Sequence, residues 1–228
     1  MPTLFVPICM IILIFGLAWL SERCLIPNKR SLSPVRKISY IATFSALAAL
    51  LMFLEFQIPF IPPFYKLDFS EIPVLICALY LGPVAGLLCE LVKILLDLII
   101  FSGTITLGVG EFANFFIGCS LVLPASVIYH RQKSKKSAII GLIVGTAIMT
   151  IAGGLLNAFY LIPAYASVMS GGMNEIMAGA SAVNPLISDI STLVLFATVP
   201  FNVFKGTLVS FLTMLLYKRV EKLFFRQK

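Results

Sequence analysis

Polar and ionisable residues interrupt the apolar segments of this chain at places where a membrane helix should avoid them. The strongest candidates for contact with a ligand are Lys66, Asp68, Glu111, Asn114, Asn157, Asn202 and Lys205. Polar groups in hydrocarbon are costly, so they mark a binding site or a pathway by default. If the segments that they open run side by side, these groups converge on one mouth of a helical bundle. The sequence therefore predicts a pocket for a polar or amphipathic small molecule.

Two of the candidate pairs have helical spacing. Asn202 and Lys205 are three residues apart and share one face of a helix, where an amide and an ammonium group suit a polyol or a carbonyl-bearing ring. The alternative is a lysine that extends to the membrane surface beside a loop-capping asparagine. Glu111 and Asn114 have the same spacing at a predicted helix start, where the helix dipole favours a carboxylate. Capping alone therefore explains Glu111 as readily as a ligand does.

The remaining candidates are less specific. Lys66, Asp68 and Glu71 lie where a loop enters a helix, and Asp68 or Ser70 could simply cap that helix. A cap does not require Lys66 and Glu71 as well, so ligand contact stays open. Asn157 is a lone amide among aliphatic residues, and a ligand or an interhelical hydrogen bond would satisfy it equally well.

Three further charged residues, Glu90, Lys93 and Asp97, lie at helical spacing on one segment. An internal network of neutralising pairs is the favoured interpretation, and a proton or ion path is the alternative.

Aromatic residues crowd the predicted mouth. A membrane-interface girdle explains most of them, and some could stack on a flat ring.

The composition identifies the class of protein that must position these groups. The chain has 228 residues, of which 60% are hydrophobic and 12% charged, and its mean hydropathy is +1.03. Soluble domains are much less apolar, so the chain is predicted to be a polytopic helical membrane protein.

Most of the 17 basic residues fall in three groups, at 23–37, 131–136 and 218–228. They mark the cytoplasmic side and attract anionic membrane lipid, which argues against a nucleic-acid partner.

The apolar segments and their breaks give the expected order of elements. Expected helices cover residues 4–20, 37–56, 69–81, 83–101, 111–129 and 138–162, with Gly82-Pro83 breaking the third from the fourth. Residues 57–64, 102–110 and 163–199 read as outer loops, the last with a short helix at 186–197. The final helix is expected to start near Thr198. A start at Ile187 would instead place Asn202 and Lys205 much deeper in the membrane.

The sequence lacks the residue patterns that disulfide bonding, metal binding, ATP hydrolysis and catalysis require. The five cysteines are odd in number and include no CxxC, so they are interpreted as small core residues without a disulfide framework or a metal site. His130 is expected at the cytoplasmic surface. No GxxxxGK[ST] motif occurs, so this chain does not hydrolyse ATP itself, and no catalytic set is recognisable.

Three ordered motifs resemble the riboflavin-binding substrate-binding (S) components of energy-coupling factor (ECF) transporters. They are KLDFSEIP at 66–73 with the following Gly82-Pro83, GEFANF at 110–115, and PFNVFKG at 200–206. The resemblance covers residues 36 to 222. It implies a six-helix bundle that binds its vitamin from outside and works with a coupling membrane subunit and two cytoplasmic ABC ATPases.

The resemblance also assigns roles. It implies that Asn157, Asn202 and Lys205 contact the flavin, while the Lys66–Asp68 loop and Glu111–Asn114 form lid or wall. A face of small residues, Ala42 and Ala46, is implied to dock the coupling subunit. One departure is a helix at residues 4–22 before the six, which bears on whether that face stays free. The expected fold is thus an all-α integral membrane protein, with residues 1–35 as the extra N-terminal transmembrane helix and basic linker, and 36–228 as the six-helix domain.

The function implied is riboflavin uptake without chemistry, with riboflavin as transported ligand and no cofactor. The expected place is the plasma membrane of a prokaryote, with the C-terminus cytoplasmic and the N-terminus outside. One alternative keeps the fold and changes the vitamin, to thiamine or pantothenate. Another is a stand-alone ion-coupled transporter that uses Glu90 and Asp97. A membrane-embedded enzyme is disfavoured, because the chain lacks a recognisable nucleophile, metal set or carboxylate pair.

Overall fold

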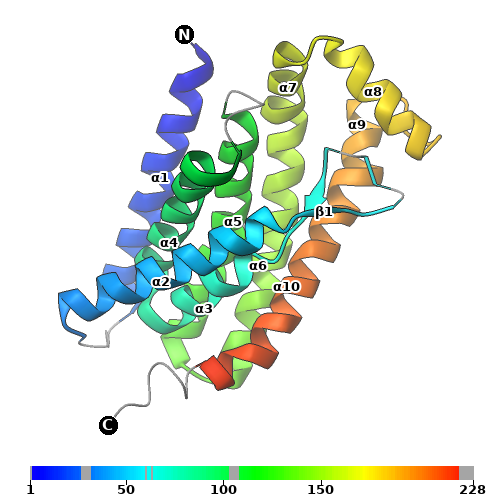
Figure 1. Ribbon diagram of the computed structural model, residues 1–228. Coiled ribbons are helices and arrows are strands. Elements are labelled where there is room, and N and C mark those ends of the chain that lie inside the picture. Colours follow the sequence, from blue (N-terminus) through cyan, green and yellow to red (C-terminus); the bar gives the residue numbers. More distant parts are fainter. Residues whose placement is uncertain (1, 27–31, 60, 63, 103–107, 221–228) are drawn as a thin grey trace.

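The computed structural model describes residues 2–26, 32–59, 61–62, 64–102 and 108–220 as a bundle of helices with one short hairpin (Figure 1). The helices are α1 (Pro2–Cys24), α2 (Pro34–Phe53), α3 (Glu71–Leu81), α4 (Pro83–Leu96), α5 (Val109–Gln132), α6 (Lys135–Leu156), α7 (Ile162–Val168), α8 (Gly172–Val183), α9 (Ile190–Leu193) and α10 (Val199–Val220). Three π-helical turns continue the helices that they follow: η1 (Asp97–Ser102), η2 (Asn157–Leu161) and η3 (Val194–Thr198). Strands β1 (Phe56–Gln57) and β2 (Lys66–Leu67) pair antiparallel.

Five helical runs in the described residues are long and apolar enough to cross a membrane. They are Val6–Cys24, Pro34–Phe53, Val109–Gln132, Lys135–Val168 and Ile190–Val220. A bilayer core needs about 20 apolar residues in a helix. The chain is therefore built as a multi-pass membrane protein, as its composition predicts. In Figure 1, α2 crosses the bundle obliquely, whereas α1, α5, α6 and α10 run roughly along its length.

The short helix α3 lies at the centre of the bundle. Every residue from Glu71 to Tyr80 is buried, and α3 packs against α2, α4, α5 and α10. A helix that is apolar on all sides is stable only when it is surrounded in this way. It ends at Gly82, whose φ of +109° is open to glycine, and Pro83 starts α4 at its first turn. The predicted Gly82-Pro83 break is confirmed.

Helices α5 and α6 are in unusually close contact. A Cβ added at Gly141 would lie 2.6 Å from the carbonyl oxygen of Ala125, and one at Gly145 would lie 2.6 Å from that of Leu121. Small residues at such positions let two backbones approach closely within a membrane. The close contact fixes the register of α5 and α6.

The first helix, α1, packs against α4 and α5. Its Ile14 and Ala18 are buried, while much of the rest of its apolar surface is exposed. At the end of α1, a carboxylate oxygen of Glu22 accepts a hydrogen bond of 3.1 Å from the backbone N–H of Val84, in the first turn of α4. Helix N-termini favour negative charge, so this contact anchors α1 to the bundle.

The small-residue stretch of α2 divides into two faces. Ala42 and Ala46 are exposed, while Ser45 and Ala49 are buried. The Ser45 hydroxyl lies 3.1 Å from the carbonyl oxygen of Cys89 on α4 and donates to it. The inner face thus holds α2 to the bundle and leaves Ala42 and Ala46 on its outer surface.

The last part of the chain differs from the sequence-based expectation. The segment predicted as the outer loop 163–199 is mostly helical, because it contains α7, α8, α9 and η3. The last spanning run begins at Ile190, so the predicted start near Thr198 is wrong. Pro200 follows an existing turn instead of opening the helix. Asn202 and Lys205 consequently lie well inside the span, where both are buried.

Two smaller predictions also need correction. Cys77, Cys89 and Cys119 are buried, but Cys9 and Cys24 are exposed on α1 and are not core residues. His130 is not a solvated surface group, because its Nε2 atom lies 3.0 Å from the carbonyl oxygen of Ala78 in α3. Of the predicted loop 102–110, residues 103–107 lie outside the part of the chain that the structure describes.

Candidate functional site

A cavity of about 590 Å³ opens among the β1–β2 hairpin, α5, α7, α8 and α10. Its volume lies within the range of roughly 300–1,000 Å³ that is typical of small-molecule sites. Its lining includes the aromatic and sulfur-containing side chains Met52, Phe64, Tyr65, Met149, Tyr165, Met169 and Phe201. It also includes the polar side chains Glu55, Lys66, Asp68, Glu71, Asp97, Glu111, Asn114, Asn157, Ser170, Glu175, Asn202 and Lys205.

A buried ion pair lies in the wall of this cavity. The Lys205 ammonium on α10 donates to Oδ2 of Asp68 at 2.7 Å, and both side chains are at least nine-tenths buried. Oδ1 of Asp68 accepts from the backbone N–H of Ser70 at 2.9 Å and from the Ser70 hydroxyl. Burial alone would raise the pKa of Asp68, but the nearby Lys205 and Lys93 ammonium groups hold that pKa below its usual range. Asp68 therefore keeps its charge and orients Lys205 towards the cavity.

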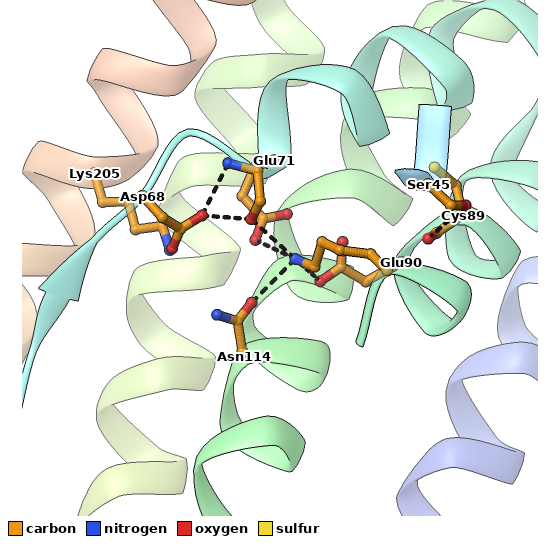
Figure 2. A network of polar contacts seen from close by, with 9 residues as sticks. Ser45, Asp68, Glu71, Cys89, Glu90, Asn114 and Lys205 are labelled. Carbon is orange, nitrogen blue, oxygen red and sulfur yellow. Dashed lines mark hydrogen bonds and ion pairs between the residues drawn. The ribbon is translucent and has the colours of Figure 1, made fainter. Parts of the chain in front are cut away.

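A second cation, Lys93 on α4, contacts Glu71 of α3, Glu90 of α4 and Asn114 of α5; these three partners are labelled in Figure 2. Its Nζ atom lies 3.1 Å from acceptor atoms of Ser70, Glu71 and Asn114, and 2.5 Å from Oε1 of Glu90. Since Ser70 also binds Asp68, the contacts run without a break from Lys205 to Glu90. The predicted pairing of Lys93 with Glu90 is present, and the other partners of Lys93 come from outside α4.

Tyr65 connects the hairpin to two π-helical turns. Its hydroxyl donates to Oδ1 of Asn157 in η2 at 3.0 Å and lies 2.5 Å from the hydroxyl oxygen of Thr198 in η3. Burial raises the pKa of the Tyr65 phenol above its ordinary value, so the phenol keeps its proton. Nδ2 of Asn157 donates to the carbonyl of Gly153 at 2.8 Å. The Asn157 amide is therefore oriented by the protein before any ligand arrives.

The side-chain amide nitrogen of Asn202, unlike that of Asn157, is not held by a hydrogen bond to any described part of the protein. Its side chain is 2% exposed, and Nδ2 has no hydrogen-bond partner among the described residues. A Cβ added at Gly153 would lie 2.5 Å from this nitrogen, so the glycine leaves the room that the amide occupies. A buried amide without a partner costs free energy. An acceptor on a ligand in the cavity would satisfy it.

All seven residues selected from the sequence lie in the wall of this one cavity. They differ in depth: Lys66 is half-exposed and pairs with Glu55, whereas Asp68, Asn157, Asn202 and Lys205 are buried. Their contact with a ligand stays a prediction. Among the described residues, no group of three or more His, Cys, Asp or Glu side chains could hold a metal ion.

Sequence reasoning missed other members of the wall. A membrane-interface girdle was expected to explain most aromatic residues, yet Tyr65, Tyr165 and Phe201 line the cavity, and Glu175 was not among the candidates. Glu175 lies on α8, in the segment expected to be a loop. The only local signal was an isolated carboxylate after Gly171-Gly172, in a stretch without basic residues.

Comparison with known families identifies the class of membrane protein to which this fold and cavity belong. The sequence profile of the family described as "ECF transporter, substrate-specific component" matches residues 36–217. The chain belongs to this family, which confirms the resemblance seen in its motifs.

Particular relatives narrow the comparison. The chain is 35% identical over 193 residues to "Riboflavin transporter RibU" of Staphylococcus aureus (strain TCH60), covering 85% of this chain and 94% of the relative. It is 31% identical over 189 residues to "Riboflavin transporter FmnP" of Bacillus subtilis (strain 168), covering 82% and 93%. A solved structure described as "Structure and mechanism of the S component of a bacterial ECF transporter" is similar with a TM-score of 0.66 and 36% identity. That similarity covers 85% of this chain and all of the solved chain.

Proposed function

We propose that this protein is the riboflavin-binding S component of an ECF-type vitamin importer. The observation that carries the proposal is the convergence of the seven selected residues on one cavity, in a chain whose relatives at 35% and 31% identity are named riboflavin transporters. The protein binds riboflavin and moves it across the plasma membrane without changing it chemically. Riboflavin is a transported ligand in this account and not a cofactor.

The lining suggests how a flavin is held. The flat ring lies among Tyr65, Tyr165 and Phe201, since aromatic faces stack favourably on planar rings. Asn202 offers a buried amide donor that lacks a protein partner, and Lys205 offers an ammonium oriented by Asp68. These donors suit ring carbonyls and ribityl hydroxyls.

The other selected residues have supporting roles. Asn157 adds a further amide to the contact surface. Lys66 and Asp68 come from the hairpin side, and Glu111 and Asn114 from the start of α5. They form wall and lid around the bound vitamin.

The charge of the wall disfavours an anionic ligand. Its carboxylates are Glu55, Asp68, Glu71, Asp97, Glu111 and Glu175, and its ammonium groups are Lys66 and Lys205. An excess of carboxylates repels anions in a site of low dielectric constant. This counts against pantothenate, which carries a carboxylate, and leaves thiamine as the vitamin to exclude by experiment.

Residues 36–228 form the six-helix domain in this proposal, and residues 1–35 provide an extra transmembrane helix and a basic linker. The N-terminus lies outside and the C-terminus in the cytoplasm, as the positive-inside rule favours. Ala42 and Ala46, which are exposed on α2, dock the coupling subunit. Two cytoplasmic ABC ATPases supply the hydrolysis for which this chain has no motif.

The test is the absorbance spectrum of the protein purified in mild detergent from a host with normal flavin levels. Flavin bands that are released only on denaturation are expected. Asn202→Ala should lose the bound flavin, while Asn174→Ala, which changes an exposed amide on α8, should keep it. Colourless protein that also fails to quench riboflavin fluorescence would overturn the ligand, and competition with thiamine would identify the alternative.

A further inference from the structure

The buried cluster around Lys93 has more carboxylates than cations. Lys93, Glu71 and Glu90 are each no more than 1% exposed. Lys93 lies 3.1 Å from Oε1 of Glu71 and 2.5 Å from Oε1 of Glu90, so one ammonium faces two carboxylates. The neighbouring pair, Asp68 with Lys205, is already balanced. Two ionised glutamates would therefore leave one uncompensated negative charge inside the bundle, where such a charge is very costly.

One carboxylate oxygen of each glutamate borders the same space beside α5. Neither Oε2 of Glu71 nor Oε2 of Glu90 has a hydrogen-bond partner within the described part of the chain. A Cβ added at Gly118 on α5 would lie 2.9 Å from Oε2 of Glu71 and 2.6 Å from Oε1 of Glu90. Because both atoms border the same point, they are no more than about 5.5 Å apart, the sum of those two distances. Gly118 thus leaves space beside α5 that is bordered by both carboxyl groups.

The charged and titratable groups around the cluster do not supply the missing positive charge. Helix α3 contributes Cys77 and Glu71, α5 contributes Cys119 and, at its start, Glu111, and the turn after α4 contributes Asp97. Asp68 pairs with Lys205 and is connected to Lys93 through the Ser70 hydroxyl. The carboxylates in this set only add negative charge. A metal cation is also disfavoured, because no group of three or more His, Cys, Asp or Glu side chains in the described part of the chain could hold one.

We propose that Glu71 and Glu90 share one bound proton, and that this part of the bundle is a protonation site of the carrier. The proton lies on a carboxyl oxygen of one glutamate and the negative charge on the other, so that with Lys93 the cluster is neutral. Lys93 then remains able to hold Ser70 and Asn114 in place, and through Ser70 it supports Asp68 in the wall of the cavity (Figure 2). Loss of the proton at high pH places a charge inside the bundle, so the affinity of the cavity for its ligand should fall as pH rises.

Infrared spectroscopy of the protein in detergent tests the proposal without any ligand. A protonated carboxylic acid gives a C=O stretching band that carboxylates lack and that shifts in D₂O. The wild type should show this band. Glu90→Gln or Glu71→Gln should remove it, while Asp189→Asn, which changes an exposed helix cap, should keep it. A wild type without the band, or a band that both glutamine variants retain, overturns the proposal.

Isotope labelling covers the case in which the variants do not fold. Protein labelled with ¹³C in the glutamate carboxyl groups should show the band shifted to lower frequency, whereas aspartate labelling should leave it in place. Glu71 and Glu90 are the most deeply buried glutamates of the described chain. A band that moves only with aspartate labelling would place the proton on Asp68 or Asp97 and contradict the proposal. Since no flavin is involved, the outcome does not depend on the proposed transport function.

Discussion

The ion pair of Lys205 and Asp68 allows the structural and ligand-binding roles of one lysine to be separated. The two side chains are 9% and 3% exposed, and their charged atoms are 2.7 Å apart. Removing one partner of a buried pair leaves the other charge uncompensated, which costs about 3–5 kcal/mol. We expect Lys205→Met and Asp68→Asn each to lower the free energy of unfolding by about this amount. The double variant, which has neither charge, should recover most of the loss.

Flavin binding should not recover in the same way. A hydrogen bond from a charged donor contributes about 1.5–3 kcal/mol, and each 1.4 kcal/mol corresponds to a factor of ten. The double variant should therefore fold nearly as well as the wild type and bind riboflavin about 10- to 150-fold more weakly. Thermal unfolding in detergent measures the first quantity, and quenching of riboflavin fluorescence measures the second.

The exposed pair Lys66 with Glu55 provides the control. Both members are more than one-third exposed, so Lys66→Met should change the free energy of unfolding by less than about 1 kcal/mol. A double variant that binds riboflavin with wild-type affinity would refute a ligand role for Lys205. Single variants as stable as the wild type would refute the argument from buried charge.

The pair also has a pH signature. Because the pKa of Asp68 is held below its ordinary value of about 3.9, its stabilising contribution is complete above that value and is lost as pH falls through the lowered pKa. Asp68→Asn should therefore remove part of the acid sensitivity of the wild type.

Three further changes test other parts of the site. Gly153→Ala places a methyl group 2.5 Å from Nδ2 of Asn202, so flavin affinity should fall at least about tenfold, whereas Gly179→Ala, with no atom within 4 Å of its added Cβ, should bind normally. Tyr65→Phe removes two hydrogen bonds and should lower the free energy of unfolding by about 1–3 kcal/mol in the same thermal assay, with wild-type stability counting against the connecting role. Ala46→Leu enlarges an exposed position on α2, so purified protein should keep its flavin affinity while cellular riboflavin uptake falls; normal uptake would argue against docking there.

The parts of the site that the sequence predicted share one physical signal. Asp68, Asn114 and Lys205 stand out because each is a polar group within an apolar segment, and such groups are rare enough to indicate function. The Gly82-Pro83 break and the start of α5 were predictable because local backbone chemistry determines them. Each of these features is determined by a short stretch of sequence, so it can be predicted without knowing which distant segments pack together.

The parts that were missed depend on contacts between distant segments. Spacing along α4 grouped Lys93 with Glu90 and Asp97, but two of its acceptors, on Glu71 and Asn114, come from α3 and α5. Glu175 reaches the cavity because α8 lies against α7, and no periodicity within that segment predicts this arrangement. The last spanning run was shortened in the prediction because Pro200 reads as a helix start, whereas the π-helical turn η3 carries the helix up to it.

The contact between α5 and α6 has a mechanical consequence. Sliding one helix along the other would drive Cα and Cβ atoms into the carbonyl groups that now fit against Gly141 and Gly145. The two helices therefore move together as one rigid body, because a close-packed interface resists small displacements. Access to the cavity must come from movement of the segments that make few contacts with α5 and α6, namely the β1–β2 hairpin and α7 with α8; the hairpin and α8 lie on the same side of the bundle (Figure 1).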